Sequence, residues 1–220
     1  MLKKLYYWLH RKLSKPEEKG EYSSGIWQDA VRRMTLNLCG DFKGRLLEVG
    51  CGEGLFLAEL AKSNKKVQIF AVDNWKDILE KGKLRIEKME LKNIKLVLSD
   101  ATSLPFKDSE FDIAVCINVI FNMESKQIVK KTVDAVSRIC IKGAKIILDF
   151  RNSKDPLLYL KYKLAPYYDK TVKDLPLKTY RIEEMLPLLD GLGLKIIQKI
   201  NLGFPLGALA PIIILELKKL

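Results

Sequence analysis

A glycine-rich loop at residues 50–54 is the part of this chain whose residue types and spacing best suit the binding of a small ligand. Gly50, Gly52 and Gly54 lie between a short apolar run and a helical pattern, in the segment LLEVGCGEGLF (46–56). Glycines at this spacing permit a tight turn and let a ligand approach the backbone closely. A helix that opens directly after the turn would point free N–H groups and a partial positive charge at that ligand.

The loop differs from two familiar phosphate-binding loops. The dinucleotide fingerprint G-x-G-x-x-G requires a small residue at position 55, where this chain has Leu55. A P-loop requires a Gly-Lys-Ser/Thr sequence, and none follows. The glycines therefore predict a ligand-binding turn of another kind.

An acidic residue ends the next apolar run, VQIFAVD (67–73). The carboxylate of Asp73 could accept hydrogen bonds from the two hydroxyl groups of a ribose. It could equally cap a helix that begins near Asn74, which is a common role for aspartate. The residue alone does not decide between these roles.

Two further runs end in polar residues. Asp100 ends IKLVLSD (94–100) and is followed by the small Ala101, so its carboxylate could accept from an exocyclic amine or simply stabilise a turn. Asn118 ends the run FDIAVCIN (111–118). If these runs are parallel strands, their carboxyl ends share one edge of a sheet, which is where open α/β sheets bind ligands.

Short apolar runs alternate with helical patterns along most of the chain. The runs are rich in Val, Ile and Leu, as central parallel strands are: 45–49, 67–73, 94–100, 111–118, 144–150, 194–200 and 211–217. The helical patterns between them are 55–63, 74–90, 126–140 and 181–193. This alternation predicts an α/β fold with a mostly parallel sheet covered by helices on both faces.

With four motifs in this order, the sequence resembles the class I S-adenosylmethionine-dependent methyltransferases, and most of all the small-molecule group with an E-x-G-x-G-x-G loop. The resemblance is close over residues 43–150 and looser over 151–220. It implies a Rossmann-like seven-stranded sheet whose last strand, 211–217, is antiparallel and pairs with 194–200, while 94–100 lies at an edge. Residues 43–220 would form the methyltransferase domain, and 1–42 an N-terminal helical extension or lid.

The resemblance also implies S-adenosylmethionine as the cofactor, and its binding residues follow by position. The residues that match the loop around its methionine part are Glu48, Gly50, Cys51, Gly52 and Gly54. The residues that match the surroundings of its adenosine part are Asp73, Asn74, Trp75, Asp100 and Ala101. Asn118 matches the place where cofactor and acceptor meet, and in similar enzymes a segment before the first motif, here carrying Tyr22 and Trp27, closes over the donor.

Because the methyl group of such a donor is already activated, the sequence need not contain a catalytic dyad, and we assign no catalytic residue. Base N-methylation usually goes with an N/D-P-P-Y/F motif, whereas this chain has NVIF at 118–121. Cytosine chemistry needs a Pro-Cys pair, whereas Cys116 follows Val115. We expect no metal site, because the chain has one histidine and no C-x-x-C pair.

The segment after the fifth predicted strand contains our candidates for binding the acceptor. Arg151 and Asn152 follow that strand, and Tyr159 and Tyr162 come next. An arginine with several tyrosines could line a pocket for an anionic or aromatic acceptor. The alternative is a helix that packs its tyrosines on the domain.

Composition limits the class of protein and its partners. The 220 residues are 48% hydrophobic and 30% charged, which excludes disordered and collagen-like chains. The net charge of +12 favours an anionic partner, but residues 1–15, with Lys3, Lys4, Arg11, Lys12 and Lys15 and no acid, hold much of it. That segment could contact a membrane surface or nucleic acid, or pack over the cofactor cleft.

No apolar run reaches the length of a membrane span, and the cysteines fit a reducing compartment, so we expect a cytoplasmic protein. The sequence predicts S-adenosylmethionine-dependent methyl transfer to a small-molecule or lipid-like acceptor by in-line displacement. Two alternatives stay open. One is an RNA methyltransferase, for which the charge outside residues 1–15 is no strong argument because it is spread thinly over helix faces where acids alternate with bases. The other is a non-catalytic cofactor-binding protein with the same fold.

Overall fold

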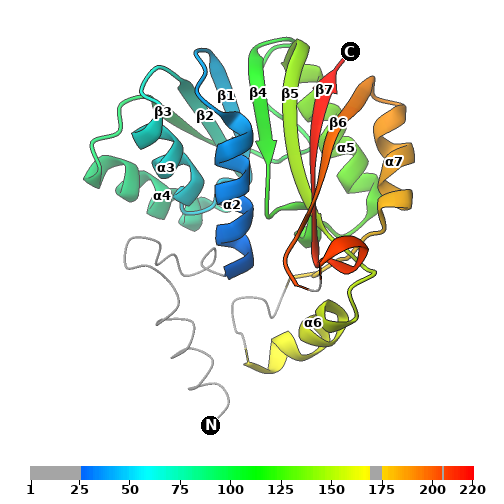
Figure 1. Cartoon of the computed structure of the whole chain (residues 1–220). Helices are drawn as coiled ribbons and strands as arrows, with labels where there is room; N and C mark the ends of the chain where they lie inside the picture. Colours follow the sequence, from blue (N-terminus) through cyan, green and yellow to red (C-terminus); the bar gives the residue numbers. More distant parts are fainter. Residues whose placement is uncertain (1–25, 169–174, 205) are drawn as a thin grey trace.

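The computed structural model describes residues 26–168, 175–204 and 206–220. One seven-stranded sheet forms the centre of the molecule (Figure 1). Its strands, in spatial order, are β3 (Ile94–Leu98), β2 (Gln68–Asp73), β1 (Arg45–Val49), β4 (Phe111–Cys116), β5 (Cys140–Arg151), β7 (Ile212–Lys219) and β6 (Leu194–Leu202). The first five are parallel, and β7 is antiparallel to both of its neighbours. This confirms the predicted Rossmann-like fold, with 94–100 at an edge and the antiparallel last strand paired with β6.

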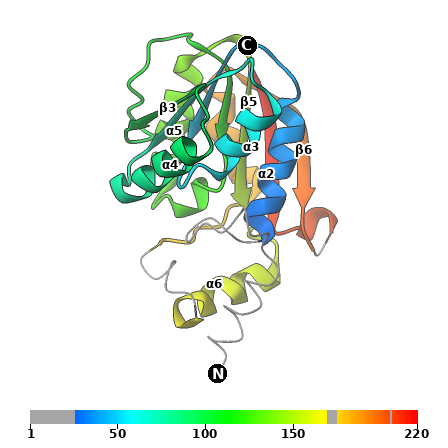
Figure 2. The same cartoon turned by 90° about the vertical axis from the view of Figure 1, so that its left-hand side faces the viewer.

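Helices cover both faces of the sheet (Figures 1 and 2). On one face lie α2 (Ile26–Cys39), α3 (Leu55–Ser63) and α4 (Lys76–Lys88), and on the other lie α5 (Lys126–Ile139) and α7 (Ile182–Asp190). Two clusters of buried apolar side chains correspond to these two layers. One includes Val31, Leu57 and Ile86, and the other includes Val133 and Met185. Because β1, β4 and β5 are sandwiched between the layers, they are apolar on both sides, as the sequence runs predicted.

Local signals explain where some helices begin. Ser125 is the N-cap of α5, and its hydroxyl accepts a hydrogen bond from the backbone N–H of Ile128 at 3.3 Å. The Glu184 carboxylate accepts from the backbone N–H of Arg181 at the start of α7. The described part of the predicted extension, α2, packs on the sheet through Val31 and Cys39 and shares its core.

Helix α6 (Pro156–Tyr168) belongs to neither layer. It follows β5 directly and lies beyond the edge formed by the carboxyl ends of the parallel strands (Figures 1 and 2). Two short 3-10 helices lie at the same edge, η2 (Ile120–Asn122) after β4 and η4 (Gly207–Leu209) between β6 and β7. None of the described helices is long and apolar enough to cross a membrane.

Candidate functional site at the carboxyl edge of the sheet

The glycine loop turns sharply between β1 and α3. Gly50, Gly52 and Gly54 all have left-handed backbone angles, with φ of +76°, +53° and +74°. The backbone N–H groups of Gly50 and Cys51 both donate to the carbonyl oxygen of Val72, at 2.8 and 3.0 Å, so the loop folds back over the end of β2. A Cβ at position 50 would lie 2.2 Å from Cγ2 of Val119, which shows how closely the loop after β4 approaches.

The carboxylate of Asp73 lies directly beside this loop. Its Oδ2 accepts from the backbone N–H of Gly52 at 2.8 Å, and its Oδ1 accepts from the backbone N–H of Trp75 at 2.9 Å. Helix α4 begins only at Lys76, with Trp75 at the N-cap, so Asp73 is not itself the cap residue. Each carboxylate oxygen accepts more than one hydrogen bond, so Asp73 can hold the loop and still bind a ligand hydroxyl.

Glu48 lies beneath the same loop with 3% of its surface exposed. Burial raises the pKa of this carboxyl group well above its usual range; the nearby Arg32 of α2 lowers it in part, and the charge of Asp73 raises it further. Within the described parts of the chain, Glu48 Oε2 has no hydrogen-bond partner. A buried oxygen without a partner is an unused acceptor directly under the turn.

The remaining predicted adenosine contacts lie at the ends of β2 and β3. Asn74 and Trp75 are exposed, with 45% of Trp75 accessible. Asp100 Oδ1 accepts from the backbone N–H and the hydroxyl of Thr102, at 2.7 and 2.6 Å, and these bonds lower the pKa of Asp100. Since β1, β2 and β3 are adjacent, the glycine loop and both aspartates line one continuous stretch of the carboxyl edge.

Asn118 is held by a buried ion pair. Its backbone N–H donates to Oδ1 of Asp149, and its side-chain Oδ1 accepts from Nη2 of Arg151 at 2.9 Å. Asp149 and Arg151 form an ion pair with each other in which both side chains are almost fully buried. These contacts fix Asn118 in a left-handed conformation, with φ of +59°. Burial raises the pKa of Asp149, and the adjacent guanidinium and the Asn118 N–H oppose that shift.

The same arginine joins the end of β5 to α6. The guanidinium carbon of Arg151 lies 4.4 Å from the ring centre of Phe121 in η2. Burial raises the pKa of the Tyr162 hydroxyl, and the nearby guanidinium of Arg151 opposes that shift. The ring centres of Phe121 and Tyr162 are 6.5 Å apart. Arg151 therefore interacts with four side chains of its own chain: Asp149, Asn118, Phe121 and Tyr162. Through these contacts it positions Asn118 and Tyr162.

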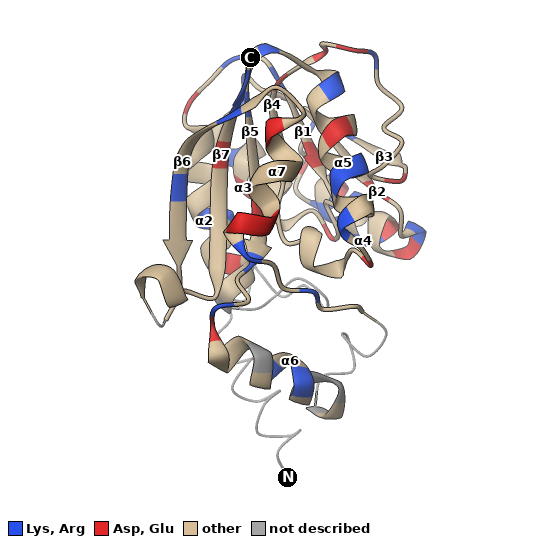
Figure 3. Cartoon of the chain, turned by 90° about the vertical axis from the view of Figure 1, so that its right-hand side faces the viewer, with Lys and Arg blue, Asp and Glu red and all other residues tan. Residues whose placement is uncertain are grey.

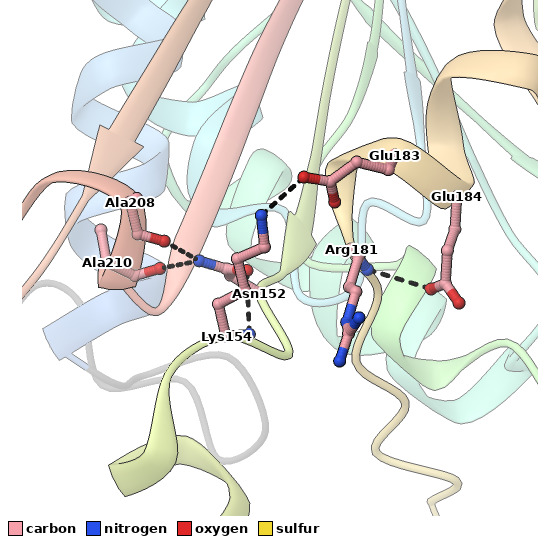
Figure 4. A network of polar contacts seen from close by, with 7 residues as sticks. All are labelled: Asn152, Lys154, Arg181, Glu183, Glu184, Ala208 and Ala210. Atoms are coloured by element: carbon pink, nitrogen blue, oxygen red, sulfur yellow. Dashed lines mark hydrogen bonds and ion pairs between the residues drawn. The ribbon is translucent and has the colours of Figure 1, made fainter.

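Asn152 is also engaged in internal contacts (Figure 4). Its amide nitrogen donates to the carbonyl oxygens of Ala208 and Ala210, at 2.9 and 2.8 Å, and its Oδ1 accepts from the backbone N–H of Lys154. These bonds tie the end of β5 to η4. Of the predicted acceptor-binding residues, Arg151 and Asn152 are thus engaged in internal contacts, and half-buried Tyr162 lies near Arg151.

Some predicted contributors fall elsewhere. The side chain of Tyr159 lies outside the described parts, as do Tyr22 and residues 1–15. Trp27 lies under the ammonium group of Lys161 in α6, with the nitrogen 3.7 Å from the ring centre. In the described ranges, no group of three or more His, Cys, Asp or Glu side chains is arranged to hold a metal ion.

Three contributors to the site were not identified from the sequence: Arg32, Phe121 and Asp149. A signal existed for Asp149. It stands two residues before Arg151, directly after the apolar residues 146–148, and residues at that spacing project from the same face. An acid and an arginine on one buried face are expected to pair. Phe121 and Arg32 carry no comparable signal, because their roles depend on contacts between distant elements.

Comparisons with known proteins agree with this geometry. Residues 46–143 match the family model described as a methyltransferase domain. A phosphatidylethanolamine N-methyltransferase of Cereibacter sphaeroides is 28% identical over 150 residues, which cover 67% of this chain and 71% of the relative. A demethylmenaquinone methyltransferase of Clavibacter sepedonicus is 28% identical over 140 residues, which cover 63% of this chain and 53% of that protein.

The fold is shared with solved structures. The N-methyltransferase NodS of Bradyrhizobium japonicum, crystallised with S-adenosyl-L-homocysteine, superposes with a TM-score of 0.68 over 97% of both chains, at 14% identity. Residues 46–143 therefore match a methyltransferase domain, and the fold around them is that of S-adenosylmethionine-dependent methyltransferases. The predicted family, enzyme class and cofactor are thereby confirmed.

The residues of this methyltransferase fit its cofactor. S-adenosylmethionine carries a positive sulfonium and an ammonium group together with ribose hydroxyls and an adenine amine. The edge offers the unpartnered Glu48 oxygen beneath the turn, the Asp73 carboxylate beside it and the Asp100 carboxylate one strand further. Acceptors and negative charges thus lie along the strand ends that would meet a cationic, hydroxyl-bearing donor.

Proposed function

We propose that this methyltransferase transfers a methyl group to a small, lipid-like acceptor by in-line displacement, with the donor held along the ends of β1, β2 and β3. The observation that carries the proposal is the hydrogen bond between the Gly52 N–H and Asp73, which fixes the ribose-binding candidate beside the glycine turn. The other donor contacts that we propose are those of Glu48, Gly50, Cys51, Gly54, Asn74, Trp75, Asp100, Ala101 and Asn118.

S-adenosylmethionine, when bound, supplies a methyl carbon on a positively charged sulfur that is a good leaving group. The main task of the protein is therefore alignment, which can supply roughly 7–11 kcal/mol of the barrier. Asp73 and the glycine turn would fix the donor end of the line. Asn118, locked by Asp149 and Arg151, would fix the loop where the acceptor arrives. Helix α6 lies over this edge and would limit the access of water.

Two observations support a lipid-like acceptor. The relatives described above are named for phosphatidylethanolamine and demethylmenaquinone. In this chain the side chains around the acceptor end of the edge include Phe121 and Tyr162, which are aromatic and lie against each other. Aromatic walls suit an apolar substrate with a polar end.

Calorimetry with S-adenosylmethionine tests the donor site. Asp73→Ala should weaken binding about tenfold or more, because each hydrogen bond to a charged group contributes roughly 1.5–3 kcal/mol. Asp73→Asn keeps an acceptor beside Gly52, so its affinity should lie between those of Asp73→Ala and the unaltered chain. Asp77→Ala, on the first turn of α4, is the matched control and should bind like the unaltered chain. Equal affinity for all four proteins would remove Asp73 from the site.

Labelled methyl transfer tests the acceptor class. The protein is incubated with methyl-labelled donor and a cell extract, and the products are separated into organic-soluble, aqueous and RNA fractions. We expect the label in the organic-soluble fraction. Label confined to RNA would favour the nucleic-acid alternative, and no transfer to any fraction would favour a non-catalytic protein.

A further inference from the structure

Helix α6 carries apolar side chains on two opposite faces. Leu158 is fully buried against the domain, and Tyr162, one turn further, is half-buried on the same side. Four other apolar side chains are between 45% and 75% exposed: Leu157, Leu160, Leu164 and Tyr167. Their spacing of three, four and three residues places them in one stripe along the outer face. A contiguous exposed stripe of this kind marks an interaction surface.

A second exposed apolar group lies at the same edge of the sheet. Phe204, Leu206 and Leu209, in the connection between β6 and β7, are between 47% and 77% exposed. The pairing of Arg151 with Ile212 places this connection beside the end of β5, from which α6 departs. Figures 1 and 3 show η4 and α6 at one end of the molecule. We call these three residues and the stripe on α6 the apolar rim.

The charges next to the rim are basic. Lys161 and Lys163 are both exposed and lie on either side of the stripe, at 100° per residue around the helix axis. Lys161 also contacts the Trp27 ring. The sequence of helix α6, PLLYLKYKLAPYY, contains no acidic residue. An apolar stripe between lysines matches an anionic bilayer surface, whereas two copies of it would bring like charges together.

We propose that α6 and the η4 connection dock this methyltransferase on an anionic bilayer, with the apolar rim in the headgroup region. The rim borders the edge that carries the glycine loop, Asp73 and Asn118. If the acceptor is a lipid, as the proposed function has it, it would pass from the bilayer to the donor without crossing water. Docking itself does not depend on the identity of the acceptor.

Vesicle flotation with the full chain tests the proposal. Vesicles of phosphatidylcholine alone are compared with vesicles that also contain phosphatidylglycerol, and we expect binding to the second kind. Leu160→Ser and Leu206→Ser should each lower the partition coefficient about fivefold to tenfold, because each removes apolar surface that the headgroup region would bury. Lys163→Ala should lower it about fivefold on the anionic vesicles only.

Leu84→Ser is the matched control, since Leu84 is an exposed leucine (64%) on α4, away from the rim, and should leave binding unchanged. Binding of S-adenosylmethionine without vesicles should be the same in all of these variants, which separates this test from that of the proposed function. Equal vesicle binding by Leu160→Ser, Leu206→Ser and the unaltered chain would overturn the proposal. So would a dimer in solution that Leu160→Ser dissociates, because the stripe would then be an interface between copies.

Discussion

Gly50 is the residue at which the loop is most tightly constrained. Its φ of +76° strains any other residue, and an added Cβ would also collide with Val119 at 2.2 Å. We expect Gly50→Ala to lower the free energy of unfolding by about 2–5 kcal/mol, the sum of left-handed strain and overpacking. Urea denaturation measures this loss.

Gly54→Ala provides the matched comparison. Gly54 has nearly the same φ of +74°, but a Cβ there would meet its nearest neighbour at an ordinary 3.7 Å. The free energy of unfolding that Gly54→Ala loses should therefore come from the strain alone, about 1–2 kcal/mol. Adding Val119→Ala to Gly50→Ala should recover part of the larger loss. Equal losses at both glycines would show that Val119 does not restrict the loop.

The ion pair of Asp149 and Arg151 gives a prediction about pH. Arg151→Met leaves a buried carboxylate without its cation, which should cost about 3–5 kcal/mol near neutral pH. Burial already raises the pKa of folded Asp149 above its unfolded value, and loss of the arginine raises it further. At a pH between the unfolded pKa of Asp149 and its raised pKa in the folded variant, the folded state binds a proton that the unfolded chain has lost. The variant therefore gains stability as the pH falls through this range.

We therefore expect urea denaturation to show that Arg151→Met loses less free energy of unfolding at pH 5 than at pH 8, each compared with the unaltered chain at the same pH. Combining Arg151→Met with Asp149→Asn removes the titrating group, and the deficit of that protein should change little with pH. A deficit in the single variant that grows toward acid would contradict the assignment of Asp149 as the responsible group.

At the residue scale, the sequence predicted which positions gather at the edge better than it predicted their contacts. The glycine loop, Asp73 and Asp100 could be found because each directly follows an apolar strand. The contacts of Arg151 could not be read in the same way. Whether an arginine faces a substrate or a buried acid depends on how Phe121, from the loop after β4, and Tyr162, from α6, pack around it.

At the scale of elements, the predicted helices and strands form, and their ends shift for local reasons. Helix α4 starts at Lys76 and not at 74, because the Asp73 side chain bonds the Trp75 N–H in a turn before the helix. Strand β5 starts at Cys140, four residues before the predicted 144, because Phe111 pairs with Cys140 across a bulge. Pairing partners from another strand extend an element beyond its own apolar run.

Helix α6 is expected to open more readily than the layered helices. Tyr162→Phe removes the half-buried hydroxyl that interacts with the Arg151 guanidinium, a polar contact that contributes about 1 kcal/mol. We expect the backbone amides of α6 to exchange their hydrogens about fivefold faster, and those of α5 to be unaffected. Hydrogen exchange followed by mass spectrometry measures both. Tyr167→Phe, at a side chain that is 75% exposed, should change neither.

At the scale of the whole molecule, the topology was predictable because parallel strands need helical crossovers that cover both faces. The position of α6 outside both layers was not predictable, because its sequence is apolar on two faces. Such a pattern is typical of a helix buried on all sides as well as of one that meets a further surface. Only the arrangement of β5, η4 and α6 distinguishes the two cases.

The four cysteines offer a test of the molecule as one cooperative unit. All are buried and unpaired: Cys39, Cys51, Cys116 and Cys140. Burial raises the pKa of Cys39 and of Cys140 to about 12, and it raises the pKa of the other two as well. Because the thiolate is the reactive form, the folded protein should react with Ellman's reagent only when it unfolds. Denatured protein, in which four thiols react at once, is the control.

S-adenosylmethionine should slow the reaction of all four thiols by the same factor, because it binds the folded state and lowers the unfolded population that each thiol needs in order to react. The four thiols belong to β1–α3, β4, β5 and α2, so they report on both layers and on the sheet between them. A donor effect confined to Cys51, which lies in the glycine loop, would instead show that the loop opens separately from the rest of the domain.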